Sequence, residues 1–198
     1  MSAKGDHVEH GKFDIRKLER LNDPGRFESL DPARMWDAIG VPSPREIVEI
    51  GAGTGLFASR FAALAPGAVV YAVDIEAVMV EWVRANRPEV AAGRIVPVLA
   101  TETRVPLDDR VADVAVMINL HHELADPAGT YAEAHRLLRD GGTLLVVDWA
   151  PGNTEHGPPQ AIRASAEVLA AAIAAAGFMA VTVHPSLKWH SMLTGLKR

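Results

Sequence analysis

The chain has 198 residues, of which 48% are hydrophobic and 23% charged, so its length suits one globular domain with a sizeable core. Its 20 Lys and Arg residues against 25 Asp and Glu residues give a net charge of −5, which argues against general binding to nucleic acid or to an anionic membrane. No cysteine is present, so disulfides, thiolate metal ligands and a cysteine nucleophile are excluded.

The N-terminal residues 1–30 are polar and irregular, and we expect them to form an arm or lid beside a single domain of residues 31–198. This segment lacks the apolar core of a secretory signal, and the absence of cysteine fits a reducing compartment, so a cytoplasmic location is expected. Asp31 is placed to cap a helix that begins with Pro32 and runs to Ile39.

Strand and helix patterns alternate through the rest of the chain. Apolar runs predict seven strands, at residues 45–50, 68–74, 94–100, 113–119, 143–149, 178–185 and 188–197. Helical patterns predict helices at residues 55–64, 76–86, 127–139 and 160–176. Gly141 and Gly142 are expected to stop the third of these, and Pro97 indicates that the third strand lies at a sheet edge. Together these patterns indicate an α/β fold: a doubly wound, mostly parallel sheet with helices on both faces and an antiparallel C-terminal hairpin.

A glycine turn follows the first predicted strand. The sequence EIGAGTG places Gly51, Gly53 and Gly55 directly before a predicted helix. Such turns bring backbone N–H groups close to a ligand, and an acid about 20 residues further on, here Asp74, suits a ribose hydroxyl. A dinucleotide fingerprint would have its third glycine one residue later, and Glu49 would repel a pyrophosphate. A cationic ligand without a phosphate, such as S-adenosylmethionine (SAM), fits Glu49 better.

In these motifs the chain resembles the class I SAM-dependent methyltransferases, in particular small bacterial enzymes similar to the ubiquinone/menaquinone-biosynthesis-like methyltransferases. EIGAGTG resembles the acid-x-G-x-G-x-G motif of that family, and AVD at 72–74 resembles its second motif. The segments 99–107, 113–124 and 137–148 are similar to the family's adenine region, its fourth strand and the approach to its fifth. The resemblance implies a Rossmann-like, seven-stranded sheet and SAM as the cofactor.

The resemblance also implies roles for single residues near the carboxyl ends of the first four strands. Asp74 would accept both ribose hydroxyls, Glu49 would lie near the ammonium, and Ile75 would pack on the adenine. Either Thr101 or Glu102 would receive the adenine amine. The remaining residues would line the methionine part or, for the last of them, the acceptor: Gly51, Ala52, Gly53, Gly55 and Asn119.

His121, His122 and Glu123 follow the predicted strand 113–119, at the edge where open α/β sheets bind their ligands. They either cap the strand end, or one histidine borders the acceptor as a base or an orienting group, with His122 preferred over His121. Metal ligation is a third alternative, but no compact set of metal-ligand spacing stands out, so no metal is expected. The two histidine side chains are expected to point in different directions.

The segment HGKFD resembles an N-terminal stretch that lies over the cofactor in close relatives, so His10, Lys12 and Phe13 are expected to form part of a lid. The alternative is a loose terminus. Asp148 ends the fifth strand at the ligand edge and is expected to face the substrate or the lid. The acceptor pocket would then be built from segments that meet at this edge: residues 7–30, 119–126, 148–160 and 185–190.

These features predict a SAM-dependent methyltransferase that moves a methyl group to a small organic acceptor by in-line displacement, with the protein mainly aligning the two reactants. The expected partner is therefore a small molecule, with no nucleic acid and no membrane, and the sequence gives no indication of the oligomeric state. Two alternatives remain open: a non-catalytic SAM-binding sensor or partner subunit, and a nicotinamide-dependent oxidoreductase.

Overall fold

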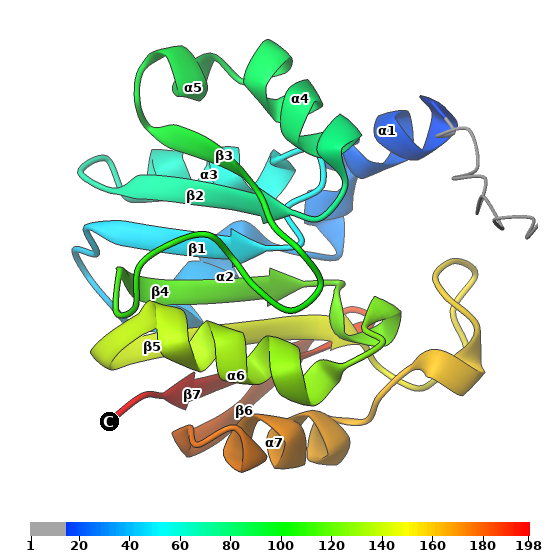
Figure 1. Cartoon of the computed structure of the whole chain (residues 1–198). Coiled ribbons are helices and arrows are strands. Elements are labelled where there is room, and N and C mark those ends of the chain that lie inside the picture. The colour runs from blue at the N-terminus through cyan, green and yellow to red at the C-terminus, as the bar shows by residue number, and fades with distance from the viewer. Residues whose placement is uncertain (1–14) are drawn as a thin grey trace, which may run out of the picture.

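The computed structural model describes residues 15–198 (Figure 1). Its strands are β1 (Glu46–Ile50), β2 (Val69–Asp74), β3 (Ile95–Leu99), β4 (Ala112–Ile118), β5 (Leu138–Trp149), β6 (Met179–Leu187) and β7 (His190–Leu196). Its α-helices are α1 (Ile15–Leu21), α2 (Pro32–Ile39), α3 (Leu56–Leu64), α4 (Ala77–Asn86), α5 (Pro88–Ala91), α6 (Pro127–Leu137) and α7 (Ala166–Ala175). Three short 3₁₀ helices are η1 (Pro24–Glu28), η2 (His121–Glu123) and η3 (Gln160–Ile162). Within this range no helix is both long and apolar enough to cross a bilayer.

All seven strands form one sheet in the order β3-β2-β1-β4-β5-β7-β6. The first five strands, β1 through β5, pair with one another in parallel. β7 lies between β5 and β6 and runs antiparallel to both. The predicted mostly parallel sheet and antiparallel C-terminal hairpin are therefore confirmed, as is the edge position of β3, which contains Pro97. Because Trp149 at the end of β5 pairs with His190 at the start of β7, the first residue of β7 lies at the edge where the parallel strands end.

Two apolar layers hold the sheet between helices. One layer contains Ile47 and Val116 of the sheet and side chains of α2 and α3. The other contains Val48 and Met117 of the same strands and side chains of α6 and α7. Figure 1 shows α6 and α7 in front of the sheet and α2 and α3 behind it. Successive side chains of a strand point to opposite faces, so both faces of these strands are apolar, as the continuous apolar runs predicted.

The predicted end of one helix is wrong. The helix expected over 127–139 ends at Leu137, and Gly141 and Gly142 lie within β5 instead of stopping the helix. A Cβ on Gly142 would lie 2.8 Å from the carbonyl oxygen of Arg139 and 3.1 Å from that of Asp113. Glycine is therefore required here by a close approach of backbones where β5 joins β4.

The prediction of one helix over 160–176 is also wrong. The structure has η3 and α7 there, with a break between them. Ser165 caps α7, and Arg163 just before it has an extended backbone. The Arg163 guanidinium donates to the carbonyl oxygens of Pro158, at 2.9 Å, and Gly152, at 3.1 Å. A guanidinium has five N–H donors, so these contacts with the preceding loop replace the continuous helix.

Candidate cofactor and acceptor site

The glycine turn between β1 and α3 has its three glycines in the left-handed region, with φ of 75° at Gly51, 54° at Gly53 and 67° at Gly55. A Cβ on Gly51 would lie only 2.7 Å from Leu120, and one on Gly55 would lie 3.2 Å from a side chain of α4. A Cβ on Gly53 would meet nothing closer than 3.7 Å, and Ala52 beside it is buried in the core. Packing therefore requires Gly51 and Gly55, whereas Gly53 leaves open space beside its backbone, as a ligand cradle would.

Asp74, the last residue of β2, orients this turn. Its Oδ2 accepts a hydrogen bond from the Gly53 N–H at 2.7 Å, and its Oδ1 accepts one from the Glu76 N–H at 2.9 Å. Burial raises the pKa of this carboxyl, and the backbone N–H groups oppose that shift. Each oxygen can accept a further hydrogen bond. The next residue, Ile75, is 51% exposed, so a carboxylate and an open apolar surface adjoin here, as a ribose and an adenine would need.

Glu49 of β1 is buried beside the turn. The residue is 2% exposed, and its Oε2 has no hydrogen-bond partner within the described part of the chain. Burial raises the pKa of this carboxyl to about 8, and the positive charge of Arg26 opposes that shift. The sequence placed a negative charge at this position, but the carboxyl is mainly protonated at pH 7 until a cation lies beside it.

Leu21, the last residue of α1, lies against the glycine turn and is the nearest neighbour of the open side of Gly53. Arg87, which follows α4, links the residues after α1 to this turn, because its guanidinium donates to Asn22 Oδ1 at 2.5 Å and to the carbonyl oxygen of Thr54 at 2.8 Å. The sequence had not indicated this role for Arg87. The three predicted lid residues lie outside the described residues: His10, Lys12 and Phe13.

The predicted adenine residues, Thr101 and Glu102, follow β3 and are exposed. Thr101 Oγ1 accepts a hydrogen bond from the Arg104 N–H at 3.0 Å, so the loop that begins here folds back on itself. Both residues therefore lie at the same sheet edge as Asp74, one strand further out.

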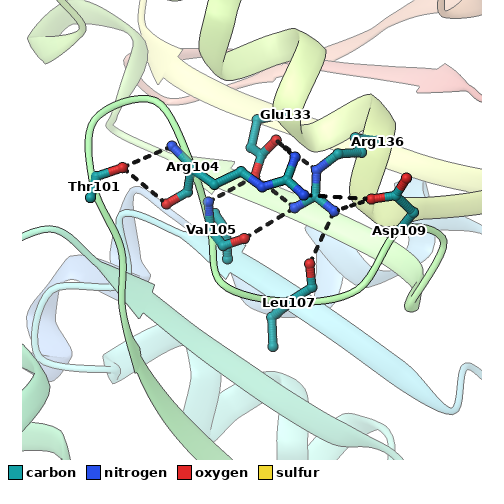
Figure 2. A network of polar contacts seen from close by, with 7 residues as sticks. All are labelled: Thr101, Arg104, Val105, Leu107, Asp109, Glu133 and Arg136. Atoms are coloured by element: carbon teal, nitrogen blue, oxygen red, sulfur yellow. Dashed lines mark hydrogen bonds and ion pairs between the residues drawn. The ribbon is translucent and has the colours of Figure 1, made fainter.

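One side chain of α6, Arg136, holds the rest of this loop (Figure 2). It donates to the carbonyl oxygens of Val105, at 3.1 Å, and Leu107, at 3.0 Å. Its guanidinium also forms ion pairs with Glu133, at 2.7 Å, and Asp109, at 2.5 Å. Glu133 in turn accepts from the Val105 N–H at 2.7 Å. The loop that would border the adenine is thus fixed to α6, and the sequence offered no signal of this beyond the helical spacing of Glu133 and Arg136.

Asn119 follows β4 with a φ of 54°, and its Oδ1 is buried without a hydrogen-bond partner in residues 15–198. The two histidines that follow point to different elements, as expected. His121 Nδ1 lies 3.0 Å from Tyr131 Oη on α6. His122 Nδ1 lies 2.8 Å from Asp148 Oδ1 on β5. The structure therefore brings the two predicted acceptor-side residues, His122 and Asp148, into one pair.

This His122–Asp148 pair has the properties of an oriented base. The His122 side chain is 8% exposed and that of Asp148 is 1% exposed. Burial lowers the pKa of His122, but the hydrogen bond and the charge of Asp148 outweigh it, so the pKa lies above its ordinary value. Burial lowers the pKa of His121. With Nδ1 held by the carboxylate, the imidazole presents Nε2 as the atom that can take a proton.

Two hollows lie beyond the end of β5. The larger, of about 420 Å³, is lined by residues 153–160 and Arg163, and the smaller, of about 180 Å³, by residues 150–154 and 187–190. Trp149 contacts both walls, because a Cβ on Gly157 would lie 2.9 Å from its ring and Trp189 stacks on it with ring centroids 6.1 Å apart. Both hollows are built mainly from segments expected to form the acceptor pocket.

Comparisons with known proteins agree with this geometry. A family model described as a methyltransferase domain matches residues 48–146. A malonyl-[acyl-carrier protein] O-methyltransferase of Geobacter sulfurreducens is 30% identical over 147 residues, which cover 74% of this chain and 50% of that protein. A ubiquinone/menaquinone biosynthesis C-methyltransferase of a Caulobacter species is 29% identical over 170 residues, which cover 78% of this chain and 65% of that protein.

Among solved structures, a SAM-dependent methyltransferase from Aquifex aeolicus superposes with a TM-score of 0.86 at 24% sequence identity. The match covers 94% of this chain and 100% of that one, and it confirms the fold. The chain spans between half and two thirds of the length of the two curated relatives.

Proposed function

Because this chain belongs to the class I SAM-dependent methyltransferases, whose cofactor is SAM, we propose that it moves the methyl group of SAM to a small organic acceptor. The observation that carries the proposal is the open backbone at Gly53, to which the Asp74 carboxylate is bonded. Glu49 of β1 and Asn119 after the neighbouring strand β4 each have a buried oxygen without a partner in the described part of the chain. A ligand with an ammonium and hydroxyl donors would satisfy these groups.

In this proposal Asp74 accepts from the ribose hydroxyls, Ile75 packs on the adenine, and Glu49 compensates the ammonium. Either Thr101 or Glu102 receives the adenine amine, and Asn119, with the turn residues, borders the methionine part. When bound, SAM supplies a methyl group on a sulfonium, and the thioether that leaves needs no proton. The chain's own residues therefore have to hold the acceptor in line with that methyl group and to accept any proton that the acceptor loses.

His122 is our candidate for accepting that proton, with Asp148 fixing its orientation. One of the two relatives is an O-methyltransferase and the other a C-methyltransferase, so they do not define the acceptor atom. The pairing at 2.8 Å favours an acceptor with a hydroxyl or amine proton to lose, because such a nucleophile needs a base.

Titration of the protein with SAM, S-adenosylhomocysteine and NAD in a calorimeter tests the cofactor assignment. Binding of the first two should also raise the melting temperature, because a ligand that binds the native state stabilises it. Release of S-adenosylhomocysteine in the presence of acceptors then tests turnover. SAM binding without turnover on any acceptor would favour the sensor alternative, and heat with NAD alone would contradict the proposal.

Replacing Asp74 by alanine should weaken SAM binding by at least about tenfold, because each charge-assisted hydrogen bond to a ribose hydroxyl contributes roughly 1.5–3 kcal/mol. Asp74→Asn is the matched control, since its amide oxygen can still accept from the Gly53 N–H and keep the turn oriented. We expect Asn to weaken binding less than Ala in isothermal titration. Unchanged affinity in a folded Ala variant would show that the ribose is held elsewhere.

Affinity for SAM should rise with pH below about 8, the pKa to which burial raises the Glu49 carboxyl. The free protein holds a proton on Glu49 at pH 7, whereas the complex needs the carboxylate beside the ammonium, so binding releases a proton. Affinity should therefore increase by up to about tenfold per pH unit between pH 6 and 7.5, as proton linkage requires. Calorimetry in buffers of different ionisation enthalpy measures both the slope and the proton release.

Glu49→Gln is the control for this dependence, because the amide keeps the shape and cannot ionise. Its affinity should be independent of pH over the same window. The stability of the free protein should change with pH in the opposite direction to SAM affinity. The native Glu49 carboxyl holds its proton more tightly than the unfolded one, so stability should fall progressively from about pH 4.5 up to about pH 8. An affinity that falls as pH rises would contradict the placement of the ammonium at Glu49.

A further inference from the structure

His190, the first residue of β7, is a buried histidine that the proposed reaction does not use. It is 0% exposed, and its ring lies 4.3 Å from that of Trp149 between centroids. Neither Nδ1 nor Nε2 has a hydrogen-bond partner among the residues that the structure describes. An unpaired buried polar group costs stability, so a histidine in this state calls for a partner that is not part of the described fold.

The smaller hollow, of about 180 Å³, is where such a partner would bind, because His190 lines it together with Lys188 and Trp189 of the β6–β7 turn. The Lys188 ammonium lies over the Trp189 ring, 4.4 Å from its centroid. No Asp or Glu is among the described residues that line this hollow, so nothing in its wall neutralises Lys188.

The surroundings of His190 favour an anion. Burial lowers its pKa to about 4, so at neutral pH the ring is uncharged and has one N–H to donate. The positive charges of Arg26 and Arg163 also lower the pKa of His190. The carboxylate of Asp148 opposes them, but it is already bonded to His122. A carboxylate beside His190 would accept the ring N–H and meet a local excess of positive charge.

The hollow lies next to the candidate base along the ligand edge. His122 contacts Asp148 of β5 from the side of β4, and His190 packs on Trp149, the next residue of β5, from the side of β7. A path along this edge therefore leads from His122 past the end of β5 to His190 and the hollow. The stacked rings of Trp149 and Trp189 belong to β5 and to the β6–β7 turn, so flat aromatic surface borders the far part of this path.

We propose that the smaller hollow binds a carboxylate at the far end of the methyl acceptor. The acceptor is then an aromatic hydroxy or amino acid derivative with its nucleophile and its carboxylate at opposite ends, the nucleophile at His122 and the carboxylate at His190 and Lys188. This rests on the proposed function, because it assumes that the acceptor reacts beside His122. Lys188 supplies charge, and His190 supplies a directed N–H.

The test uses the full chain saturated with S-adenosylhomocysteine and titrated with para-hydroxyphenylpropanoate or with its amide, which has the same shape and no charge. We expect the acid to bind about tenfold more tightly than the amide. Lys188→Ala should reduce this preference by about three- to fivefold, the range of an exposed ion pair. His190→Phe, which keeps an aromatic ring against Trp149, should remove most of it, because the N–H donor is lost.

Arg45→Ala is the matched control, because it removes an exposed cation just before β1, at the opposite edge of the sheet. Its preference for the acid should equal that of the unchanged chain. His190→Gln, which retains a side-chain N–H donor, should keep part of the preference, and it replaces the Phe variant as the test if that variant does not fold.

Three results would overturn the inference: equal affinity for acid and amide, absence of acid binding up to millimolar concentration, or a preference that survives both Lys188→Ala and His190→Phe. Binding of S-adenosylhomocysteine is measured first in the same cell. If it fails, the proposed function fails and this inference with it. If it succeeds and the acid preference is absent, only the carboxylate site is rejected.

Discussion

Replacing Gly53 by valine is expected to abolish SAM binding while most of the fold is kept. The Cβ would meet nothing of the protein within 3.7 Å, so the branched side chain would occupy the open space beside the turn backbone, where the cofactor has to approach. The φ of 54° makes any non-glycine residue strained here, at a cost of about 1–3 kcal/mol, which is less than the typical stability of a domain. Calorimetry should show a loss of affinity of at least about 100-fold.

Gly51→Val is the matched comparison for this experiment. A Cβ on Gly51 would lie 2.7 Å from Leu120, so this variant should lose thermal stability as well as SAM binding. Circular dichroism melts separate the two effects. If Gly53→Val binds SAM with unchanged affinity, the turn is structural and the central inference from EIGAGTG is wrong.

Replacing His122 by alanine is expected to lower turnover by about 100-fold or more, the lower range for losing a general base. SAM affinity should barely change, because in the proposed reaction this imidazole contacts the acceptor and not the cofactor. The base acts when it is deprotonated, and its bond to Asp148 raises its pKa, so turnover of the unchanged chain should fall as pH decreases through a value above 6.5. The pH–rate profile of the Ala variant should lack this acidic limb.

Asp148→Asn tests the pairing separately. The Asn oxygen can still accept from the ring, but the charge that raises the pKa of His122 is lost, so the acidic limb should move to lower pH. If the acidic limb of the pH–rate profile stays at the same pH in this variant, the role of Asp148 is contradicted. If His122→Ala weakens SAM binding and leaves turnover intact, the residue is a cofactor contact. If neither quantity changes, the histidine only caps the strand end and catalysis is alignment alone.

The sheet, and the meeting of the glycine turn with Asp74 at its edge, could be predicted because their signals are local. An apolar run, a glycine turn and an acid at the end of the next strand lie within 30 residues of one another, and each has a known geometric meaning. Pro97 likewise reports an edge strand by itself, because it cannot donate to a second neighbour.

The contacts on the proposed acceptor side could not be predicted because they join residues far apart in sequence. His122 and Asp148 are 26 residues apart, and the sequence put both at the ligand edge without showing that they bond. Arg136 reaches back 29 residues to Leu107 from what reads as an ordinary helix face. Arg163 lies within a good helical pattern, but its side chain bonds to carbonyl oxygens of the preceding loop and the helix is interrupted there, which is a tertiary effect.

The reversed direction of β7 has a consequence for how acceptor preference can change over evolution. Because β7 runs antiparallel to β5, the ligand edge receives the first residue of β7 and the short turn that joins it to β6, not the end of a strand. The proposed cofactor cradle at residues 49–74 and the proposed acceptor wall at residues 187–190 are far apart in the sequence. Mutations in the hairpin turn should retune which acceptor is taken without loss of SAM affinity, so one scaffold can diverge into a series of enzymes with different substrates.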